Sequence, residues 1–467
     1  MQAVKPLKII FIIRSPEVFH HYQSIVRSLV SRGHRLEVLF DPRWSKGESL
    51  EAVQALQQSG MPFIYGFSEI RSDFWRRILF HTRELLSFRR YLVVEKHRQS
   101  RYYRDRWEGY LPRSLRWLLR LPLAKSALKS RMTSAFLKSI ERVMPPSRII
   151  VEKLRAASPD AVVAGPVNMR FSSADLEYLK AAVFLKIPTA VPVVSWDNLT
   201  TKGLFHVWPD RLLVWNDVQR EEAIEHQFFP AERISMIGAP LFDGWFDGLK
   251  PSLARDVFCA AHHLCPDHPF ILYLGSSCNV AQDETWVIKE LRRALDDIKD
   301  RVISKVQIVV RPHPANYAIY DKLNLPGVSV IPRRGTLPDS SSARQLFIDT
   351  SAYALGVVVG ANTTAVIDSI ILGKPAIVFL NDHYSKTQLE TLHFKQLLEA
   401  DVFDKVRTPE GFIAAVNRLL KGEDTHKEAR ERYIQSAVRP WGLERSAGEI
   451  AADEIERLAE EKKTSFP

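Results

Sequence analysis

The sequence predicts an α/β protein built from two Rossmann-like layers. Apolar, β-branched runs alternate with segments of helical spacing, and two such alternating sets follow each other along the chain. The chain has 467 residues, more than one hydrophobic core usually organises. Because strand–helix alternation of this kind produces a parallel sheet covered by helices, we expect two domains of similar architecture.

The first alternating set begins with the run LKIIFII at residues 7–13, which has the composition of a buried parallel strand. A helical segment then stops at Gly33, and a second strand-like run is followed by a helix that stops at Gly60. The alternation resumes at PDAVVAGP and continues through TAVPVVSW and DRLLVWN. We therefore assign residues 1–240 to an N-terminal domain.

The second set begins near residue 268 and contains the runs PFILYLGSS, KVQIVVRPHP, ALGVVVGANTT and KPAIVFL. It follows a Gly-, Pro- and Asp-rich linker, GAPLFDGWFDGLKPSL. We assign residues 241–420 to a C-terminal domain and expect residues 421–467 to form helices that pack back across the domains. Since ligands bind beyond the carboxyl ends of parallel strands, we expect an interdomain cleft there.

The basic charge is concentrated in one segment. Arg71 to Arg155 holds 22 Lys and Arg against 7 Asp and Glu, a net charge of +15, whereas the rest of the chain carries −4. Residues 71–150 are rich in aromatic residues, Leu and Arg, and we predict an all-helical basic insertion. Such helices suit an anionic membrane surface. The alternatives are a helical subdomain that packs its Leu and Trp internally and, least favoured, a nucleic-acid surface.

Three cysteines, an N-terminus without signal-peptide features and the lack of a long apolar run predict a cytoplasmic protein. With the basic insertion, we expect it at the inner face of the cell membrane. The cluster His262-His263-x-Cys265-x-x-His268 lacks a second ligand pair at finger-like separation, so we expect no metal site.

Residues suited to phosphate binding follow three strands of the second domain. A strand ends at Gly360 and a helix begins near Asn362, where backbone N–H groups attract phosphate and Asp368 could accept bonds from a ribose. Arg311 and His313 leave another strand and can neutralise a phosphate leaving group without a metal. The predicted donor-binding residues are Gly275, Ser276, Ser277, Arg311, His313, Gly360, Asn362, Thr363, Thr364 and Asp368. The alternative treats the threonines as helix caps, Asp368 as a solvated helix residue and His313 as a loop residue without ligand.

Polar residues also end strands of the first domain, above all in VVSWDNLTTKG at residues 193–203. A general base must reach an acceptor hydroxyl, and the candidates are Asp197, Glu17, His20 and His21. The predicted acceptor or cleft residues are Trp196, Asn198, Thr200, Thr201 and Lys202. They should face RPHP and GANTT across the cleft. The alternative is a capped turn in which Trp196 fills core.

Together these motifs resemble the GT-B superfamily of nucleotide-dependent glycosyltransferases. The nearest groups are CDP-glycerol glycerophosphotransferase-like proteins, capsule Kdo and sialic acid transferases, and UDP-GlcNAc 2-epimerases. The matching features are the His-Pro of RPHP, the pair Thr363-Thr364 with Asp368, the run LGKPAIVF and Gly238-x-Pro240-x-x-Asp243. The relatives usually carry serines at the two threonine positions, and many glycosyltransferases carry Glu where Asp368 stands. The resemblance covers most of residues 155–400 and leaves the basic insertion unmatched.

The resemblance implies a nucleotide-activated glycosyl or glycerophosphate-like transferase that acts in surface polysaccharide or lipid-linked glycan synthesis. The C-terminal domain would hold the donor, with His313, Thr363 and Thr364 at its phosphates and Asp368 at its ribose. The N-terminal domain would hold the glycan or lipid-linked acceptor. The nucleotide-activated donor is a substrate, and neither a metal nor another cofactor is implied. The alternatives are a UDP-sugar 2-epimerase and a non-catalytic, membrane-associated scaffold. No acidic cluster matches the epimerase catalytic residues, which favours a transferase.

Overall fold

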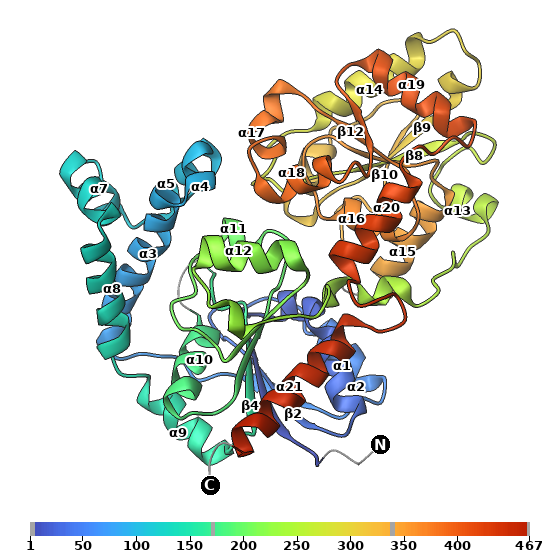
Figure 1. The fold of residues 1–467 in the computed structure, drawn as a ribbon. Helices are drawn as coiled ribbons and strands as arrows, with labels where there is room; N and C mark the ends of the chain where they lie inside the picture. Colours follow the sequence, from blue (N-terminus) through green and yellow to red (C-terminus); the bar gives the residue numbers. More distant parts are fainter. Residues whose placement is uncertain (1–4, 170–172, 337–340, 465–467) are drawn as a thin grey trace. The chain divides into compact units, whose positions relative to one another are not determined.

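The computed structural model describes residues 5–169, 173–336 and 341–464 and divides into two compact units (Figure 1). Unit 1 comprises Met1–Gly244 and Gln435–Pro467, and unit 2 comprises Trp245–Ile434. The division falls four residues after the predicted domain boundary at residue 240. The end of the chain is part of unit 1.

Unit 1 contains a seven-stranded parallel sheet in the order β3-β2-β1-β4-β5-β6-β7. Its strands are β1 Lys8–Ile13, β2 Arg35–Phe40, β3 Ile64–Phe67, β4 Ala161–Gly165, β5 Thr189–Pro192, β6 Arg211–Val214 and β7 Ile234–Met236. Five of the six residues of β1 are buried, as expected for a central strand covered by helices on both faces. The predicted strand–helix alternation is confirmed here.

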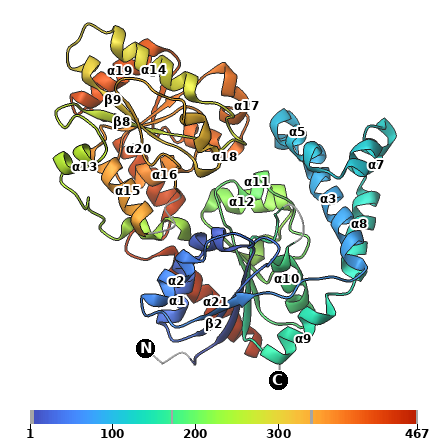
Figure 2. The ribbon, with the colours of Figure 1, turned by 180° about the vertical axis from the view of Figure 1, so that it is seen from behind.

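The helices around this sheet are α1 Gln23–Ser31, α2 Glu51–Gln58, α10 Ala174–Phe184, α11 Asn198–Thr201, α12 Asp217–Gln227 and α21 Ala447–Thr464, with 3₁₀ segments η1 Pro16–His21, η2 Ala231–Arg233 and η3 Pro240–Phe246. The last helix, α21, packs along α1 (Figure 2). Arg32 pairs with Asp453 at 2.7 Å and Glu456 at 2.9 Å. These ion pairs and apolar contacts tie the end of the chain to the first helix.

Between β3 and β4 the chain forms the predicted helical insertion. It consists of α3 Trp75–Val93, α4 Glu95–Gln99, α5 Arg101–Tyr110, α6 Arg113–Leu118, α7 Pro122–Lys129, α8 Arg131–Val143 and α9 Arg148–Ala157. Helices α3 and α8 run side by side in Figures 1 and 2.

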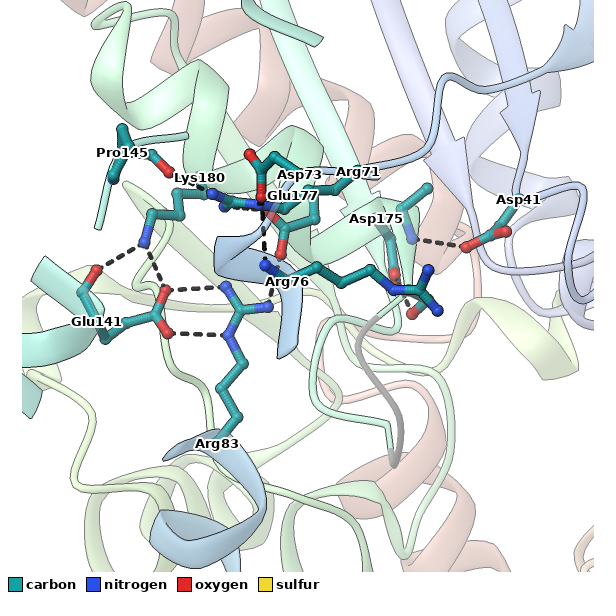
Figure 3. Close-up of polar contacts among 12 residues, drawn as sticks. Asp41, Arg71, Asp73, Arg76, Arg83, Glu141, Pro145, Asp175, Glu177 and Lys180 are labelled. Carbon is teal, nitrogen blue, oxygen red and sulfur yellow. Dashed lines mark hydrogen bonds and ion pairs between the residues drawn. The ribbon is translucent and has the colours of Figure 1, made fainter. Parts of the chain in front are cut away.

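A buried ion network joins this insertion to α10 (Figure 3). Arg83 of α3 makes two bonds to the Glu141 carboxylate of α8, both 2.9 Å, and a third of 2.6 Å to Glu177 of α10. Lys180 of α10 donates to the same Glu141 at 2.8 Å, and Arg71 contacts Glu177 at 3.0 Å. Part of the basic charge of residues 71–155 is therefore neutralised by buried carboxylates inside the protein.

Unit 2 contains a six-stranded parallel sheet in the order β10-β9-β8-β11-β12-β13. Its strands are β8 Phe270–Leu274, β9 Gln307–Arg311, β10 Val328–Val330, β11 Val357–Val359, β12 Ala376–Phe379 and β13 Asp404–Val406. Its helices are α13 Arg255–Ala261, α14 Thr285–Asp297, α15 Ser341–Tyr353, α16 Ala365–Ile371, α17 Ser385–Gln388, α18 Leu392–Glu399, α19 Pro409–Leu420 and α20 Lys427–Tyr433. Shorter helical segments are η4 Ile303–Lys305, η5 Pro314–Tyr320, η6 Asp382–Tyr384 and the π-helical η7 Ile434–Val438, which begins at the unit boundary.

The unit 2 sheet has a core of Val, Ile, Leu and aromatic side chains between its strands and the helices α14 and α19. The two doubly wound parallel sheets agree with the predicted fold class. None of the helices in the described ranges combines the length and apolar character needed to cross a bilayer.

Candidate functional site

Three neighbouring strands of unit 2 end together at the predicted donor site. Leu274 of β8 lies in register with Arg311 of β9 on one side and with Val359 of β11 on the other. Because parallel strands share one carboxyl edge, the loops that begin at Gly275, Pro312 and Gly360 leave the sheet next to one another. The structure thus brings together segments that are far apart in the sequence.

Two of the predicted glycines allow this edge to be closely packed. A Cβ atom added at Gly360 would lie 1.8 Å from the hydroxyl oxygen of Tyr273, and one at Gly275 would lie 2.7 Å from that of Tyr320. No real Cβ approaches another atom so closely. A side chain at either position would displace a tyrosine hydroxyl, so glycine permits the close packing seen here.

These tyrosines surround a buried carboxylate, Glu284, which sequence reasoning missed. Glu284 accepts bonds from the backbone N–H of Ser276 at 2.6 Å, from the Ser276 hydroxyl at 3.1 Å and from Tyr273 at 3.2 Å. Burial raises the pKa of Glu284 to about 7, although these hydrogen bonds favour its charged form. In the sequence, Glu284 precedes a helix and resembles an ordinary acidic residue at a helix start, so no local signal separates the two roles.

Ser276 links the β8 and β11 loops. Its side chain is fully buried, and its hydroxyl also accepts a 3.2 Å bond from the backbone N–H of Asn362. The Asn316 side chain donates to the Ser276 carbonyl at 3.2 Å. The hydroxyl and carbonyl of Ser276 thus both form hydrogen bonds within the protein, and these bonds connect the loops at this edge. Ser277, on the same loop, is partly exposed.

The GANTT segment follows β11. The side-chain amide of Asn362 donates to the carbonyl of Thr387 at 3.0 Å and lies 3.2 Å from the His393 ring. Thr363 is nearly buried, and its hydroxyl accepts a long 3.4 Å bond from Ala365. Thr364 precedes α16, is partly exposed and makes no side-chain capping bond.

Arg311 and His313 sit on the neighbouring β9 end. Arg311 donates to the carbonyl of Thr336 at 2.7 Å and lies 4.4 Å over the Phe347 ring, so its guanidinium is held in place. The Nδ1 of His313 accepts a 3.1 Å bond from Ala315, which leaves the hydrogen of a neutral ring on Nε2. Burial, and then Arg311, lower the pKa of His313. A lowered pKa favours the uncharged ring, whose Nε2–H can donate a hydrogen bond.

Asp368 on α16 is buried, and burial raises its pKa to about 7. Three groups oppose this rise: the charge of Arg311, a hydrogen bond from Trp245 and the charge of Arg344. A carboxyl that titrates near neutrality can donate as well as accept a hydrogen bond. This buried position differs from the solvated helix residue that the sequence allowed as the alternative.

In unit 1 the structure brings two candidate bases together. His21, at the end of η1, hydrogen-bonds the backbone of Val194 and lies within electrostatic reach of Asp197 and Lys202. Burial, and then the adjacent His20, hold the pKa of His21 well below its usual value. The His20 ring lies 4.1 Å from that of His21, and its Nδ1 lies 2.7 Å from the carbonyl oxygen of Glu17 on the same 3₁₀ segment. Glu17 is exposed, and its backbone N–H donates to the Glu48 carboxylate at 2.9 Å.

The carboxylate of Asp197 is held by its own loop. It accepts bonds from the hydroxyls of Ser195 at 2.6 Å and Thr201 at 2.7 Å, and Lys202 lies 3.3 Å away. Trp196 is buried, and Asp197 directly precedes the short helix α11. The burial of Trp196 and the helix start after Asp197 agree with the capped-turn alternative, but the Asp197 side chain makes no capping hydrogen bond to α11.

Helix α11 is buried against the insertion. The Arg90 guanidinium, fully buried on α3, donates to the carbonyl of Leu199 at 2.8 Å and also to that of Lys202. The indole N–H of Trp107 on α5 donates to the carbonyl of Thr201 at 3.0 Å. The side chains of Asn198, Thr200 and Thr201 are at most 4% exposed, whereas those of Ser195, Asp197 and Lys202 reach the surface in part. Sequence reasoning missed the role of Arg90, because nothing local pairs residue 90 with residue 200.

Across the described part of the chain, no group of three His, Cys, Asp or Glu side chains is arranged to hold a metal ion. Cys265 and the histidines around it lie near β8, and all three cysteines are free.

Comparison with known proteins identifies relatives by structure alone. No family model matches the sequence, and no curated protein matches it. The UDP-GlcNAc 2-epimerase from Methanocaldococcus jannaschii superposes with a TM-score of 0.55 at 14% identity, covering 97% of this chain and 100% of that one.

Two further solved structures show the same likeness. The S. aureus MnaA–UDP co-structure has a TM-score of 0.52 at 11% identity and covers 96% of both chains. A glycosyltransferase from Rickettsia africae ESF-5 has a TM-score of 0.53 at 10% identity, covering 97% of this chain and 99% of that one. The chain thus shares the two-domain, Rossmann-like fold of these solved structures, which include UDP-GlcNAc 2-epimerases and a glycosyltransferase.

Proposed function

We propose that this protein is a nucleotide-activated transferase that moves a glycosyl or glycerophosphate-like group in surface polysaccharide or lipid-linked glycan synthesis. The observation that carries the proposal is the meeting of three strand ends in unit 2, at Leu274, Arg311 and Val359. Loops at this edge of an α/β sheet are where nucleotides bind. The S. aureus MnaA structure, which has the same fold, was solved with UDP, and this supports a nucleotide ligand.

At this edge we assign the donor phosphates to the Nε2–H of His313 and to Thr363 and Thr364. Asp368 is assigned to the ribose, because a carboxyl with a pKa of about 7 can both donate and accept hydrogen bonds. Gly275 and Gly360 keep the floor of the site free of side chains. Arg311, Ser276 and Asn362 position the loops.

The test is titration with UDP and CDP by calorimetry. His313→Ala and Thr364→Ala should each weaken binding of the favoured nucleotide about tenfold, the effect of losing one or two hydrogen bonds to a charged group. His268→Ala, a histidine at the amino end of β8 and so at the opposite edge of the same sheet, is the matched control and should bind normally. Unchanged affinity in both site variants would remove the donor-site assignment.

We propose His21 as the general base for the acceptor hydroxyl, with Asp197 beside it. A base must be unprotonated to act, and the lowered pKa of His21 keeps its ring neutral at pH 7. Its Nδ1 is buried and has no hydrogen-bond partner within the described residues. His21→Gln should lower kcat about 100-fold while leaving nucleotide affinity unchanged. His20→Gln is the control, and an equal loss of kcat there would contradict the choice of His21.

A UDP-sugar 2-epimerase is the second candidate, because UDP-GlcNAc 2-epimerases are among the solved structures with this fold. Incubation with UDP-GlcNAc and no acceptor separates the two functions. Formation of the 2-epimer identifies an epimerase, whereas a transferase leaves the sugar unchanged until an acceptor is added. A scaffold without catalysis would bind vesicles but no nucleotide.

Membrane association is proposed for the tip of the insertion. Residues 109–140 contain seven Lys or Arg and no Asp or Glu. Trp117, Leu118, Leu121 and Leu123 are between 44% and 86% exposed on α6, on α7 and between them. Lys125 pairs with Glu108 at 3.3 Å. Exposed apolar side chains beside an excess of cations suit an anionic lipid surface. Arg71, Arg83 and Arg90 are buried and take no part.

Vesicle sedimentation tests this surface. The protein should bind phosphatidylglycerol vesicles at low salt, bind phosphatidylcholine weakly, and lose most binding in the variant Trp117→Ser/Leu123→Ser. The control variant Ile64→Ser/Phe67→Ser changes equally exposed apolar residues on β3 and should bind normally. Equal binding to both vesicle types would contradict the proposal.

A further inference from the structure

Unit 1 contains a cavity of about 380 Å³ that has no part in the candidate site described above. It lies between helices α3, α8 and α10 and the segment 204–208, so the insertion and the Rossmann-like layer both contribute walls. Its volume falls within the range of small-molecule binding pockets.

The walls of the cavity are largely apolar, with contributions from Leu86, Leu204, Phe205 and Val207. Four further apolar lining residues, Val183, Phe184, Trp208 and Phe228, are between 38% and 59% exposed. Lining residues that are this exposed show that the cavity opens to solvent along an apolar rim. An open apolar cavity is costly in water unless an apolar group enters it.

The polar floor of the cavity is already satisfied. Glu141 and Lys180 line it, and both belong to the ion network shown in Figure 3. His206 lies with Nε2 3.3 Å from the Ser87 hydroxyl, and burial lowers its pKa to about 3, which keeps the ring uncharged. The floor therefore offers no unbalanced charge to a ligand.

The rim of the cavity is different, because cations gather there without a counter-ion. Lys138 and Arg142 line the cavity one turn apart on α8, and among the described residues no carboxylate pairs with either. The only acid between them, Glu141, points to Arg83 and Lys180 instead. Burial, and then the like charges of Arg89 and Arg142, lower the pKa of Lys138. The Arg89 Nε is buried without a hydrogen-bond partner.

We infer that this cavity binds a single-chain anionic amphiphile, with the hydrocarbon chain inside the cavity and a phosphate on Lys138 and Arg142, next to Arg89. An apolar chain fills the space between α8 and α10, and a phosphate neutralises cations that otherwise repel one another. Two sources share this chemistry, a prenyl phosphate and a phospholipid with one acyl chain. The inference does not depend on the donor site in unit 2.

Calorimetric titration of the full-length protein with dodecyl phosphate, below its critical micelle concentration, tests the inference. We expect saturable binding with one site per chain and no binding of inorganic phosphate at the same concentration. Using monomeric ligand separates this cavity from the proposed membrane surface of α6 and α7, which needs vesicles. Absence of saturable binding by the wild type overturns the inference.

Two variants locate the ligand. Lys138→Gln/Arg142→Gln changes two exposed side chains and should weaken dodecyl phosphate binding at least tenfold. Val183→Trp places a large side chain at the rim and should also weaken binding at least tenfold, with the thermal midpoint reporting that the fold is intact. Arg131→Gln removes an exposed cation from the same helix outside the cavity and should bind as the wild type does. Unchanged binding in Val183→Trp, or an equal loss in Arg131→Gln, overturns the assignment.

Competition then separates the two sources. Displacement of dodecyl phosphate by geranylgeranyl phosphate at lower concentration than by lysophosphatidic acid supports a prenyl phosphate ligand, and the reverse order supports a phospholipid. Displacement by neither contradicts binding of a long-chain phosphate.

Discussion

Two buried glutamates, Glu141 in unit 1 and Glu284 in unit 2, show how surroundings decide the state of a carboxylate. Both are nearly inaccessible to solvent, at 6% and 0% exposed. Burial acts to raise the pKa of each, but Arg83 and Lys180 hold that of Glu141 at about 2. Within the described residues, Glu284 accepts hydrogen bonds from hydroxyls and a backbone N–H but pairs with no cation, and its pKa rises to about 7. Burial alone therefore does not predict the charge of a carboxylate, because paired cations can reverse its effect.

The comparison also distinguishes an ion network that joins helices from carboxyl groups that lie near the candidate site. The Glu141 network joins α3, α8 and α10 and is neutralised within the protein. Glu284 and Asp368 both titrate near neutrality and flank the strand ends where we place the nucleotide. Ionisable groups with shifted pKa values are common at functional sites, because catalysis and binding use buried ionisable groups that would otherwise only destabilise the fold.

The largest expected effect follows from removing one partner of the unit 1 network. Glu141→Gln leaves Lys180 buried without a carboxylate and Arg83 with Glu177 alone, and it should lower the free energy of unfolding by about 3–5 kcal/mol. Urea denaturation at pH 7 measures it. The control Glu152→Gln removes an exposed ion pair with Arg148 and should show no measurable loss. Equal stability of the two variants would mean that the network contributes little.

The next effect is a pH dependence of opposite sign in the two regions. Because the folded-state pKa of Glu284 exceeds its ordinary value of 4.5, its protonated form stabilises the fold at low pH, and this stabilisation is lost as pH rises through about 7. The difference in unfolding free energy between wild type and Glu284→Gln should thus fall by up to about 3 kcal/mol between pH 4.5 and 8.

Glu141 behaves in the reverse manner. Its folded-state pKa is lowered to about 2, so its stabilisation is present above pH 4.5 and is lost as pH falls towards 2. The difference between wild type and Glu141→Gln should shrink over that acidic range. Denaturation curves at several pH values check both signs, and parallel profiles for the two variants would contradict the comparison.

A smaller effect sharpens the description of the unit 2 site. Gly360→Ala would place a Cβ against the Tyr273 hydroxyl and push it away from Glu284, at a cost of about 1–3 kcal/mol. In a Tyr273→Phe background, which lacks that hydroxyl, the same substitution should cost less. Gly109→Ala, on a helix with open space around the glycine, is the control and should not destabilise. An equal cost of Gly360→Ala in both backgrounds would show that the hydroxyl is not the obstacle.

The fold class and much of the candidate site could be predicted from local patterns. The runs LKIIFII, FILYL and VVV consist of consecutive apolar residues and form buried strands. The helices that end at Gly33 and Gly60 could be predicted because glycine readily adopts a positive φ. The register of β8, β9 and β11 confirms that Gly275, His313 and Gly360 follow adjacent strand ends. Because the carboxyl ends of parallel strands lie at one edge of a sheet, the predicted topology and the positions of the motifs were enough to place these residues near one another.

What the tertiary structure alone decided are the partners of buried polar groups. Glu284 accepts a hydrogen bond from Tyr320, and Arg90 donates hydrogen bonds to carbonyls of residues 199–202. His21 lies within electrostatic reach of Asp197. The loop 196–201, predicted as an acceptor surface, is largely buried by the insertion, whose own helices no motif matched. The hydrophobic periodicity that predicts strands and helices can be read from neighbouring residues. Desolvation and ion pairing depend instead on which distant segments fold against one another. The sequence therefore determined the layers and the strand ends, and only packing decided which polar residues reach solvent and which stay paired inside.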